Sequence, residues 1–209
     1  MKRLLLPAAI AVTVLSAPAA AQAATLAVDQ PCYPVGGVIT VTGTGFTPGA
    51  TVQLSYSNAG TAASPVADGA GNFTAQVPAP SITRDEQPIA INATDGTNAA
   101  PAALRITRPE VETRPGRANP RRRVLYRVRG FTQARRVFIH YVYRGRHRGT
   151  VRLTRKRGPC GVFTRRMRML PVRTIRFGTW RVQVDARRRY SSRTVPRLTG
   201  SLTIFRTFR

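Results

Sequence analysis

Several residue types are scarce in this chain of 209 residues. It contains two cysteines, two histidines, two lysines and only eight acidic residues. Two cysteines are too few for a small protein held together by disulfides. The glycines lack the strict period of collagen, and an apolar content of 42 % is too high for a disordered tail. The chain is therefore expected to form packed structure, and its length allows one or two domains.

Long apolar runs are also absent after the N-terminus. Residues 1–23 have the layout of a secretory signal peptide, with Lys2 and Arg3 before an apolar run at 4–15 and Ala21-Gln22-Ala23 before Ala24. The run is shorter than a membrane span requires, although an uncleaved anchor helix stays open as an alternative. No lipoprotein Leu-x-x-Cys motif lies at this site. We expect a mature chain that starts at Ala24, has no transmembrane segment, and is secreted or located in the extracytoplasmic cell envelope.

Acidic residues are rare in one half of the mature chain in particular. Residues 24–107 carry two cations and five anions, a net charge of −3, whereas residues 108–209 carry thirty cations and three anions, a net charge of +27. Such a shift is typical of a domain boundary with different partners on either side. We therefore predict a signal peptide (1–23), a slightly acidic domain (24–107) and an arginine-rich domain (108–209).

No segment of the mature chain has a convincing helical period. Short alternating runs recur between turn residues instead, which is typical of β-strands. The expected strands are 38–42, 51–56, 72–77, 88–93, 103–106, 124–128, 137–141, 150–153, 180–185 and 201–204. About seven short strands in each half is the pattern of an immunoglobulin-like sandwich. The predicted fold class is all-β, with two tandem immunoglobulin-like β-sandwiches after a cleaved signal peptide.

The two halves also align with each other as a degenerate repeat. Residues 45–56 align with 130–141 at an offset of 85, including an identical Gly-Phe-Thr. Further matches pair Phe73 with Phe163 at offset 90, 89–93 with 180–184 at offset 91, and 104–106 with 202–204 at offset 98. The offset only increases along the chain, as expected if the insertions lie in loops.

A family resemblance follows from these motifs. Residues 45–52, Gly-Phe-Thr-Pro-Gly-Ala-Thr-Val, and 68–74, Asp-Gly-Ala-Gly-Asn-Phe-Thr, resemble the turns of bacterial immunoglobulin-like repeats in exported and surface proteins. The resemblance covers 25–107 well and 108–209 loosely. The second half resembles an arginine-rich module of exported actinobacterial proteins, through Gly-Pro-Cys-Gly (158–161) and Gly-Thr-Trp (178–180). It implies a fold, not an activity, because sandwiches host many tasks.

Residues for catalysis are few. His140 is expected on the solvent-facing side of its strand. A catalytic triad could be assembled from Ser191, His140 and Asp185, but no nucleophile-elbow motif supports it. Too few carboxylates accompany the histidines for a metal site or a glycosidase pair. Trp180 is assigned to the core, since it alternates with two valines. We predict no enzyme activity, no cofactor and no small-molecule substrate.

The arginines offer a binding function instead. A sandwich with a net charge of +27 repels itself unless anions lie near, and arginine suits phosphate and carboxylate groups. The expected partner is an anionic polymer or surface: a wall polymer, an acidic polysaccharide, an anionic lipid or extracellular DNA. The candidate residues, all from arginine clusters, are Arg187, Arg188, Arg189, Arg155, Lys156, Arg157, Arg144, Arg146 and Arg148. The alternative is a structural or adhesive module without a specific ligand, whose charge serves solubility or envelope retention. One concentrated basic face would favour binding, and an even coat would favour the alternative.

The two cysteines are predicted to pair with each other. Export places Cys32 and Cys160 in an oxidising compartment, and their even number leaves no odd thiol. Cys32 follows the first strand of one sandwich and Cys160 precedes the fifth strand of the other, at ends that face each other across the linker. Two free thiols and bridges between molecules stay open as alternatives.

Overall fold

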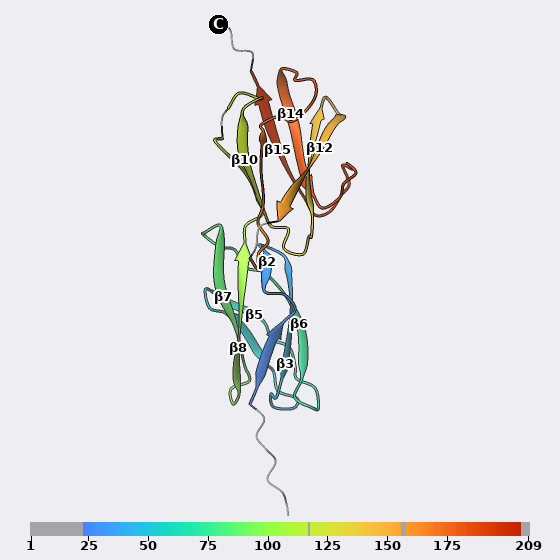
Figure 1. The fold of residues 1–209 in the computed structure, drawn as a ribbon. Helices are drawn as coiled ribbons and strands as arrows, with labels where there is room; N and C mark the ends of the chain where they lie inside the picture. The colour runs from blue at the N-terminus through green and yellow to red at the C-terminus, as the bar shows by residue number, and fades with distance from the viewer. Residues whose placement is uncertain (1–22, 117, 156–157, 206–209) are drawn as a thin grey trace, which may run out of the picture.

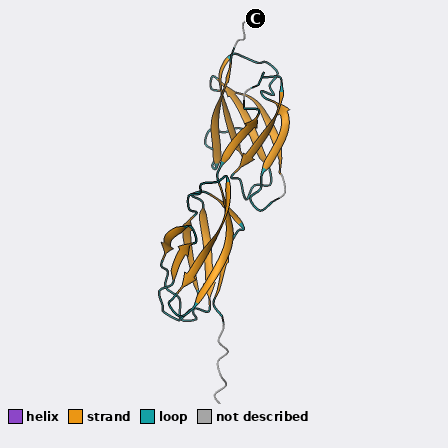
Figure 2. Ribbon diagram, turned by 90° about the vertical axis from the view of Figure 1, so that its left-hand side faces the viewer, coloured by secondary structure: helices purple, strands orange, loops and turns teal. Residues whose placement is uncertain are grey.

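The computed structural model describes residues 23–116, 118–155 and 158–205. All its regular elements are β-strands, arranged as two units placed end to end (Figures 1 and 2). The predicted all-β class with two tandem sandwiches is confirmed. Within the described ranges there is no helix that could cross a membrane. The signal sequence, apart from Ala23, lies outside these ranges, so its cleavage stays a prediction.

The first unit has two sheets. Its strands are β1 (Thr25–Val28), β2 (Cys32–Pro34), β3 (Val38–Thr44), β4 (Gln53–Tyr56), β5 (Ala59–Ala63), β6 (Phe73–Pro78), β7 (Glu86–Thr94) and β8 (Ala99–Thr107). One sheet has the order β1-β3-β6, and the other has the order β2-β8-β7-β4-β5. β2 runs parallel to β8, whereas the other strand pairs are antiparallel. Their apolar sides enclose one hydrophobic core.

The second unit encloses a core of its own, but its strands are connected differently. Its strands are β9 (Glu110–Arg114), β10 (Arg123–Arg129), β11 (Val137–Tyr143), β12 (Arg146–Arg155), β13 (Phe163–Arg168), β14 (Gly178–Asp185) and β15 (Arg197–Ile204). They form a continuous sheet of order β15-β14-β11-β12-β13-β10-β9. It is continuous because β12 pairs with β11 along most of its length and with β13 through Thr154 and Arg155 at its end.

The tandem repeat is reproduced residue by residue in the two cores. Gly45 and Gly130 both have positive φ, of 76° and 93°, and each is followed by a buried phenylalanine. Val52, Leu54 and Tyr56 are buried in the first unit, as are their repeat counterparts Val137, Ile139 and Tyr141 in the second. Trp180 is 1 % exposed, which confirms its assignment to the core. The glycine lets the chain turn sharply, and the aromatic ring behind it closes the end of the core.

All ten predicted strands are present, and the differences lie at the margins. β1 and β13 were expected only as the strands next to Cys32 and Cys160, without residue ranges. Neither β2 nor β5 was predicted, since three residues around Cys32 and the Ala/Gly segment 59–63 give no alternating pattern. The proline-rich stretch after residue 107 contains β9, the first strand of the second unit.

The junction between the units is held by a disulfide and by ion pairs. Cys32 and Cys160 are bonded, with Cα atoms 5.1 Å apart and both residues buried. The predicted pairing is confirmed. Arg129 of β10 is only 3 % exposed and pairs with Asp85 of the first unit and with Glu110 and Glu112 of β9. A covalent bond and a buried cation therefore connect the two sandwiches.

Candidate anion-binding site

The candidate site lies on the outward side of β12, β11 and β14, here called the outer face. Every residue of β11 is buried, although only alternate residues point into the core. The outward set on β11 is Phe138, His140 and Val142. Register places Thr150 of β12 and Gln183 of β14 on either side of His140. Something other than the core must therefore cover this side of the strand.

That cover is the connection between β14 and β15, residues 186–196, here called the covering loop. His140 is fully buried beneath it, so the expectation of a solvent-facing histidine is wrong. The ring Nε2 donates to the carbonyl of Arg187, 3.0 Å away, and lies 3.4 Å from Asp185 Oδ1. Nδ1 then accepts from the hydroxyl of Thr150 at 2.9 Å. Sequence alternation gave the correct face of the strand but not the loop that folds over it.

Further polar contacts hold the covering loop in place. Asp185 Oδ1 accepts from the backbone N–H of Arg187 at 2.8 Å. Gln183 Nε2 donates to Asp185 Oδ2 and to the carbonyl of Ser191. The Tyr190 ring stacks on His147, with centroids 5.3 Å apart and planes 5° from parallel. These contacts tie the backbone of the covering loop to the sheet, although Gln183 Oε1 and the hydroxyl of Thr194 are buried without a hydrogen-bond partner among the described residues.

These arginines complete a pocket of about 860 Å³. Its lining, here called the basic pocket, consists of Arg136, Phe138, Thr150, Arg152, Arg188 and Arg189. The four arginines come from three separate elements: the start of β11, strand β12 and the covering loop. All four are exposed to solvent, while Phe138 is buried at the floor. Four arginines that line one hollow suit a multiply charged anion.

Asp185 is a buried carboxylate of the second unit and does not line the basic pocket. Asp185 has no exposed surface and is used by the His140, Gln183 and Arg187 contacts. Glu110 and Glu112 lie at the junction with Arg129 and Arg114. These three are all the acidic residues after residue 107. Asp185 is therefore a buried carboxylate beneath the covering loop, and the lining of the basic pocket contains no acidic residue.

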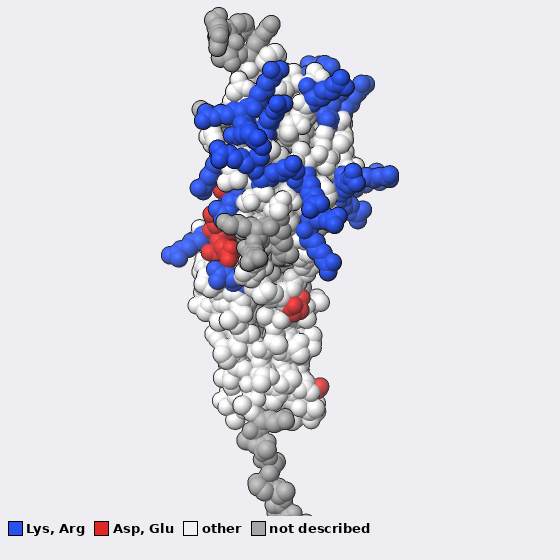
Figure 3. Space-filling view, viewed as in Figure 1, with Lys and Arg blue, Asp and Glu red and all other residues white. Residues whose placement is uncertain are grey.

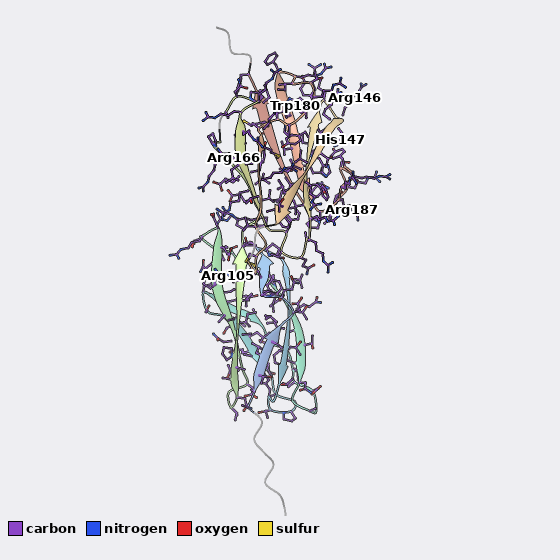
Figure 4. All side chains as sticks on the ribbon, viewed as in Figure 1. Arg105, Arg146, His147, Arg166, Trp180 and Arg187 are labelled. Carbon is purple, nitrogen blue, oxygen red and sulfur yellow. A yellow bond between two sulfur atoms is a disulfide. The ribbon has the colours of Figure 1, made fainter. Side chains whose placement is uncertain are left out.

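The predicted cluster residues are divided by the fold. Arg188 and Arg189 line the basic pocket, and Arg187 lies beside them with its backbone bound to Asp185 and His140. Arg144, Arg146 and Arg148 are exposed in and after the β11–β12 turn. Figure 4 shows Arg146 at the far end of the unit from the junction. Arg148 lines a smaller pocket of about 170 Å³. The Arg155 side chain, Lys156 and Arg157 lie outside the described residues.

Two residues of the basic pocket were not among the predicted site residues. Arg136 follows Arg135 just before β11, and Arg152 has no arginine directly beside it in the sequence, although β12 also contains Arg146, Arg148 and Arg155. The hairpin register could have found Arg152, because it lies directly opposite Phe138. Pairing an isolated arginine with an outward aromatic residue across a hairpin is a usable sequence signal.

The overall charge distribution is broader than one site. Figure 3 shows basic side chains across the second unit from one edge of the view to the other, and few on the first unit. Arg166 on β13 lies on the other side of the unit from Arg187 in the view of Figure 4. Basic side chains thus cover much of the visible surface of the second unit (Figure 3), and in the basic pocket four arginines line one hollow.

The site does not have the arrangement of a hydrolytic triad. His140 and Asp185 lie together, but the Ser191 hydroxyl accepts from the backbone N–H of Arg193, and its carbonyl accepts from Gln183. Burial raises the pKa of both Tyr126 and Tyr141, so these core phenols stay protonated at neutral pH. Among the described residues, no three histidine, cysteine or acidic side chains gather as a metal site would require.

Comparisons with known proteins give only broad likenesses. No family model and no curated protein matches the chain. Among solved structures, the human OSCAR ligand-binding domain is 13 % identical, with 88 % of this chain and 98 % of that chain covered and a TM-score of 0.36. Bovine butyrophilin is 8 % identical, with 88 % and 99 % covered and a TM-score of 0.31. Salmonella alpha-2-macroglobulin is 12 % identical with a TM-score of 0.31; the match covers 90 % of this chain and 15 % of that longer one.

Proposed function

We propose that this is an exported, non-enzymatic protein whose second unit binds an anionic polymer of the cell envelope through the basic pocket. The observation that carries the proposal is the convergence of Arg136, Arg152, Arg188 and Arg189 on one hollow. Like charges repel, so four guanidinium groups held around one space favour an anion between them. A polymer is preferred to a flat lipid surface because a hollow admits a chain more readily than a plane.

The extracytoplasmic location has two supports. One is the N-terminal signal-like sequence, and the other is the buried disulfide, a bond that persists in oxidising compartments. The disulfide also joins the two units, so the first unit, with a net charge of −3, would hold the basic unit at a fixed angle toward its ligand. The resemblance to repeats of bacterial surface proteins is in keeping with that use.

The alternative, a coat of charge without a specific ligand, has its own observation. The basic side chains in Figure 3 are spread rather than confined to one patch. Under this alternative the location of an arginine would not matter, and only the number removed would. The two functions can therefore be separated by removing equal charge from two places.

The test compares two fourfold variants of the mature chain on immobilised heparin and on linear polyphosphate. One changes Arg136, Arg152, Arg188 and Arg189 to Gln; the control changes Arg122, Arg123, Arg166 and Arg168, which are exposed elsewhere on the unit. Counterion release makes polyanion binding weaken steeply as salt is added. In a plot of the logarithm of the binding constant against the logarithm of the salt concentration, the slope becomes smaller in magnitude by about 0.7 for each phosphate that a cation no longer neutralises. We expect the slope of the pocket variant to be smaller by about three and its elution to need less salt than that of the control.

Three results would overturn the proposal. Equal losses in both variants would favour the charge coat. Elution of the unchanged protein at low salt would show that it has no useful affinity for polyanions. Retention on anionic lipid vesicles but not on either polymer would point to a membrane surface instead.

A further inference from the structure

A second hollow lies on the same outer face, farther from the junction. This distal pocket has a volume of about 480 Å³ and is lined in part by Val142, Arg144, Arg181 and Tyr190. Its two arginines are exposed, and none of its lining residues is acidic. The guanidinium group of Arg144 lies 5.5 Å from the centre of the Tyr143 ring. The outer face therefore has a second place where arginines border a hollow.

Strand β11 fixes the relation between the two pockets. Phe138 belongs to the basic pocket and Val142 to the distal pocket, and both point outward from the same strand. Four residues of a strand span about 13 Å at about 3.3 Å per residue. His140, the outward residue between them, is buried. The spacing of the pockets is thus set by the backbone and does not depend on flexible side chains.

An aromatic ridge separates the pockets. The Tyr190 ring lies 5.7 Å from the His140 ring and stacks on His147, and Tyr190 also borders the distal pocket. Going along the outer face, a chain would meet four arginines, then a largely uncharged ridge, then two arginines. A compact anion fits one pocket, whereas a ligand with separated charges can use both.

We propose that the two pockets form one track for a linear polymer that carries an anionic group on each repeating unit. The inference rests on the proposed function and adds the shape of the ligand. A chain already held in one pocket presents its next charges to the other at high effective concentration, which raises affinity without any new kind of contact. A ligand that cannot reach across about 13 Å gains nothing from this linkage.

Calorimetry with two phosphate ligands tests the track. Tripolyphosphate, which is too short to span the ridge, is expected to bind twice per protein molecule with modest affinity. Long-chain polyphosphate is expected to bind at least about tenfold more tightly per site through the linkage. In a basic-pocket variant, R152Q with R188Q, or a distal-pocket variant, R144N with R181Q, tripolyphosphate should bind once. Asn is used at position 144 because that residue has a φ of 46°, which Asn tolerates.

The long chain gives the decisive comparison. Either two-residue variant should lose about tenfold or more in affinity, and combining the two variants should cost less than the product of their separate losses. The control variant, R166Q with R168Q, should lose less than about threefold. Separate losses that multiply, or equal per-site affinities for short and long phosphates, would overturn the track. If neither phosphate binds in a salt-sensitive way, the proposed function fails as well, which is a distinct outcome.

Discussion

The two units share one skeleton but differ in what covers the same sheet. In the first unit, β7 and β8 are joined by a four-residue turn, residues 95–98. In the second, β14 and β15 are joined by the eleven-residue covering loop. The difference of seven equals the rise of the repeat offset from 91 to 98. The covering loop carries Arg188 and Arg189 of the basic pocket, so two of its four arginines lie in the connection with the largest length difference between the repeats.

The residues beneath the insertion differ accordingly. The repeat counterpart of His140 is Ser55, which lies opposite Asn92 on β7 and stays partly exposed. A short turn cannot reach this position, so a small polar side chain facing water suffices. In the second unit, the loop brings backbone groups onto the sheet, and the buried imidazole donates to one of them, the carbonyl of Arg187. An outward strand position thus becomes part of a core once a loop is long enough to cover it.

Removing the disulfide should have the largest effect on this pair of units. The bond joins residues 128 positions apart, and the chain-entropy model assigns such a closure about 4–5 kcal/mol, an upper figure. We expect Cys32→Ser with Cys160→Ser to lower the free energy of unfolding by up to that amount and to separate the unfolding of the two units. Guanidinium unfolding, followed by Trp180 fluorescence and by far-UV circular dichroism, measures both. A single transition unchanged in midpoint would contradict the expectation.

The ion pairs of the two units should differ in strength because their burial differs. Arg129 is nearly fully buried among three carboxylates, whereas Arg105 and Glu86 of the first unit form a partly exposed pair at 2.6 Å. Arg129→Ala leaves acidic groups without their cation and should cost about 2–3 kcal/mol, reduced from the fully buried case since those carboxylates reach solvent. Arg105→Ala should cost under about 1 kcal/mol. Thermal unfolding of both variants makes the comparison, and equal losses would contradict it.

Substitution of His140 should distinguish it from its counterpart Ser55. His140→Ala removes the groups that bind Thr150 and the carbonyl of Arg187, and should destabilise the second unit by about 2 kcal/mol. Ser55→Ala should change the first unit by less than about 0.5 kcal/mol. The same His140 variant should lose polyphosphate affinity, because the covering loop is no longer held. Limited proteolysis within residues 186–196 reports loop release, and resistance equal to the unchanged protein would refute this.

The smallest expected effect is on the stability of the first unit at low pH, through Asp95. Asp95 accepts backbone hydrogen bonds from Thr47, Thr97 and Asn98, which hold the pKa of its carboxyl well below its usual value. A lowered folded-state pKa means that this contribution is complete above the unfolded value of about 3.9 and is lost as pH falls toward the folded value. Asp95→Asn should therefore flatten the fall in melting temperature below about pH 4. An acid dependence as steep as that of the unchanged protein would argue against the assignment.

Much of this architecture can be read directly from the sequence. Alternating runs such as 180–185 must place one face inward, so the core residues follow from period and polarity. Glycine at 45 and 130 followed by phenylalanine marks equivalent turns, because a positive φ favours glycine there. The pairing of Cys32 with Cys160 follows from strand order, since that order decides which loops meet at the junction. Each of these is local chemistry or simple topology.

The tertiary structure alone decided which arginines lie around one pocket and why His140 is buried. Arg136, Arg152 and Arg188 are far apart in sequence, and their convergence depends on hairpin register and on the path of one loop. Clustering along the sequence predicted residues 144–148 and 187–189 as two sets. In the fold, Arg144 lines the distal pocket and Arg148 the smaller pocket, whereas Arg188 and Arg189 line the basic pocket. The physical reason is that charge is a property of residues, whereas an electrostatic site is a property of distances. Those distances are set by backbone packing that alternation does not encode.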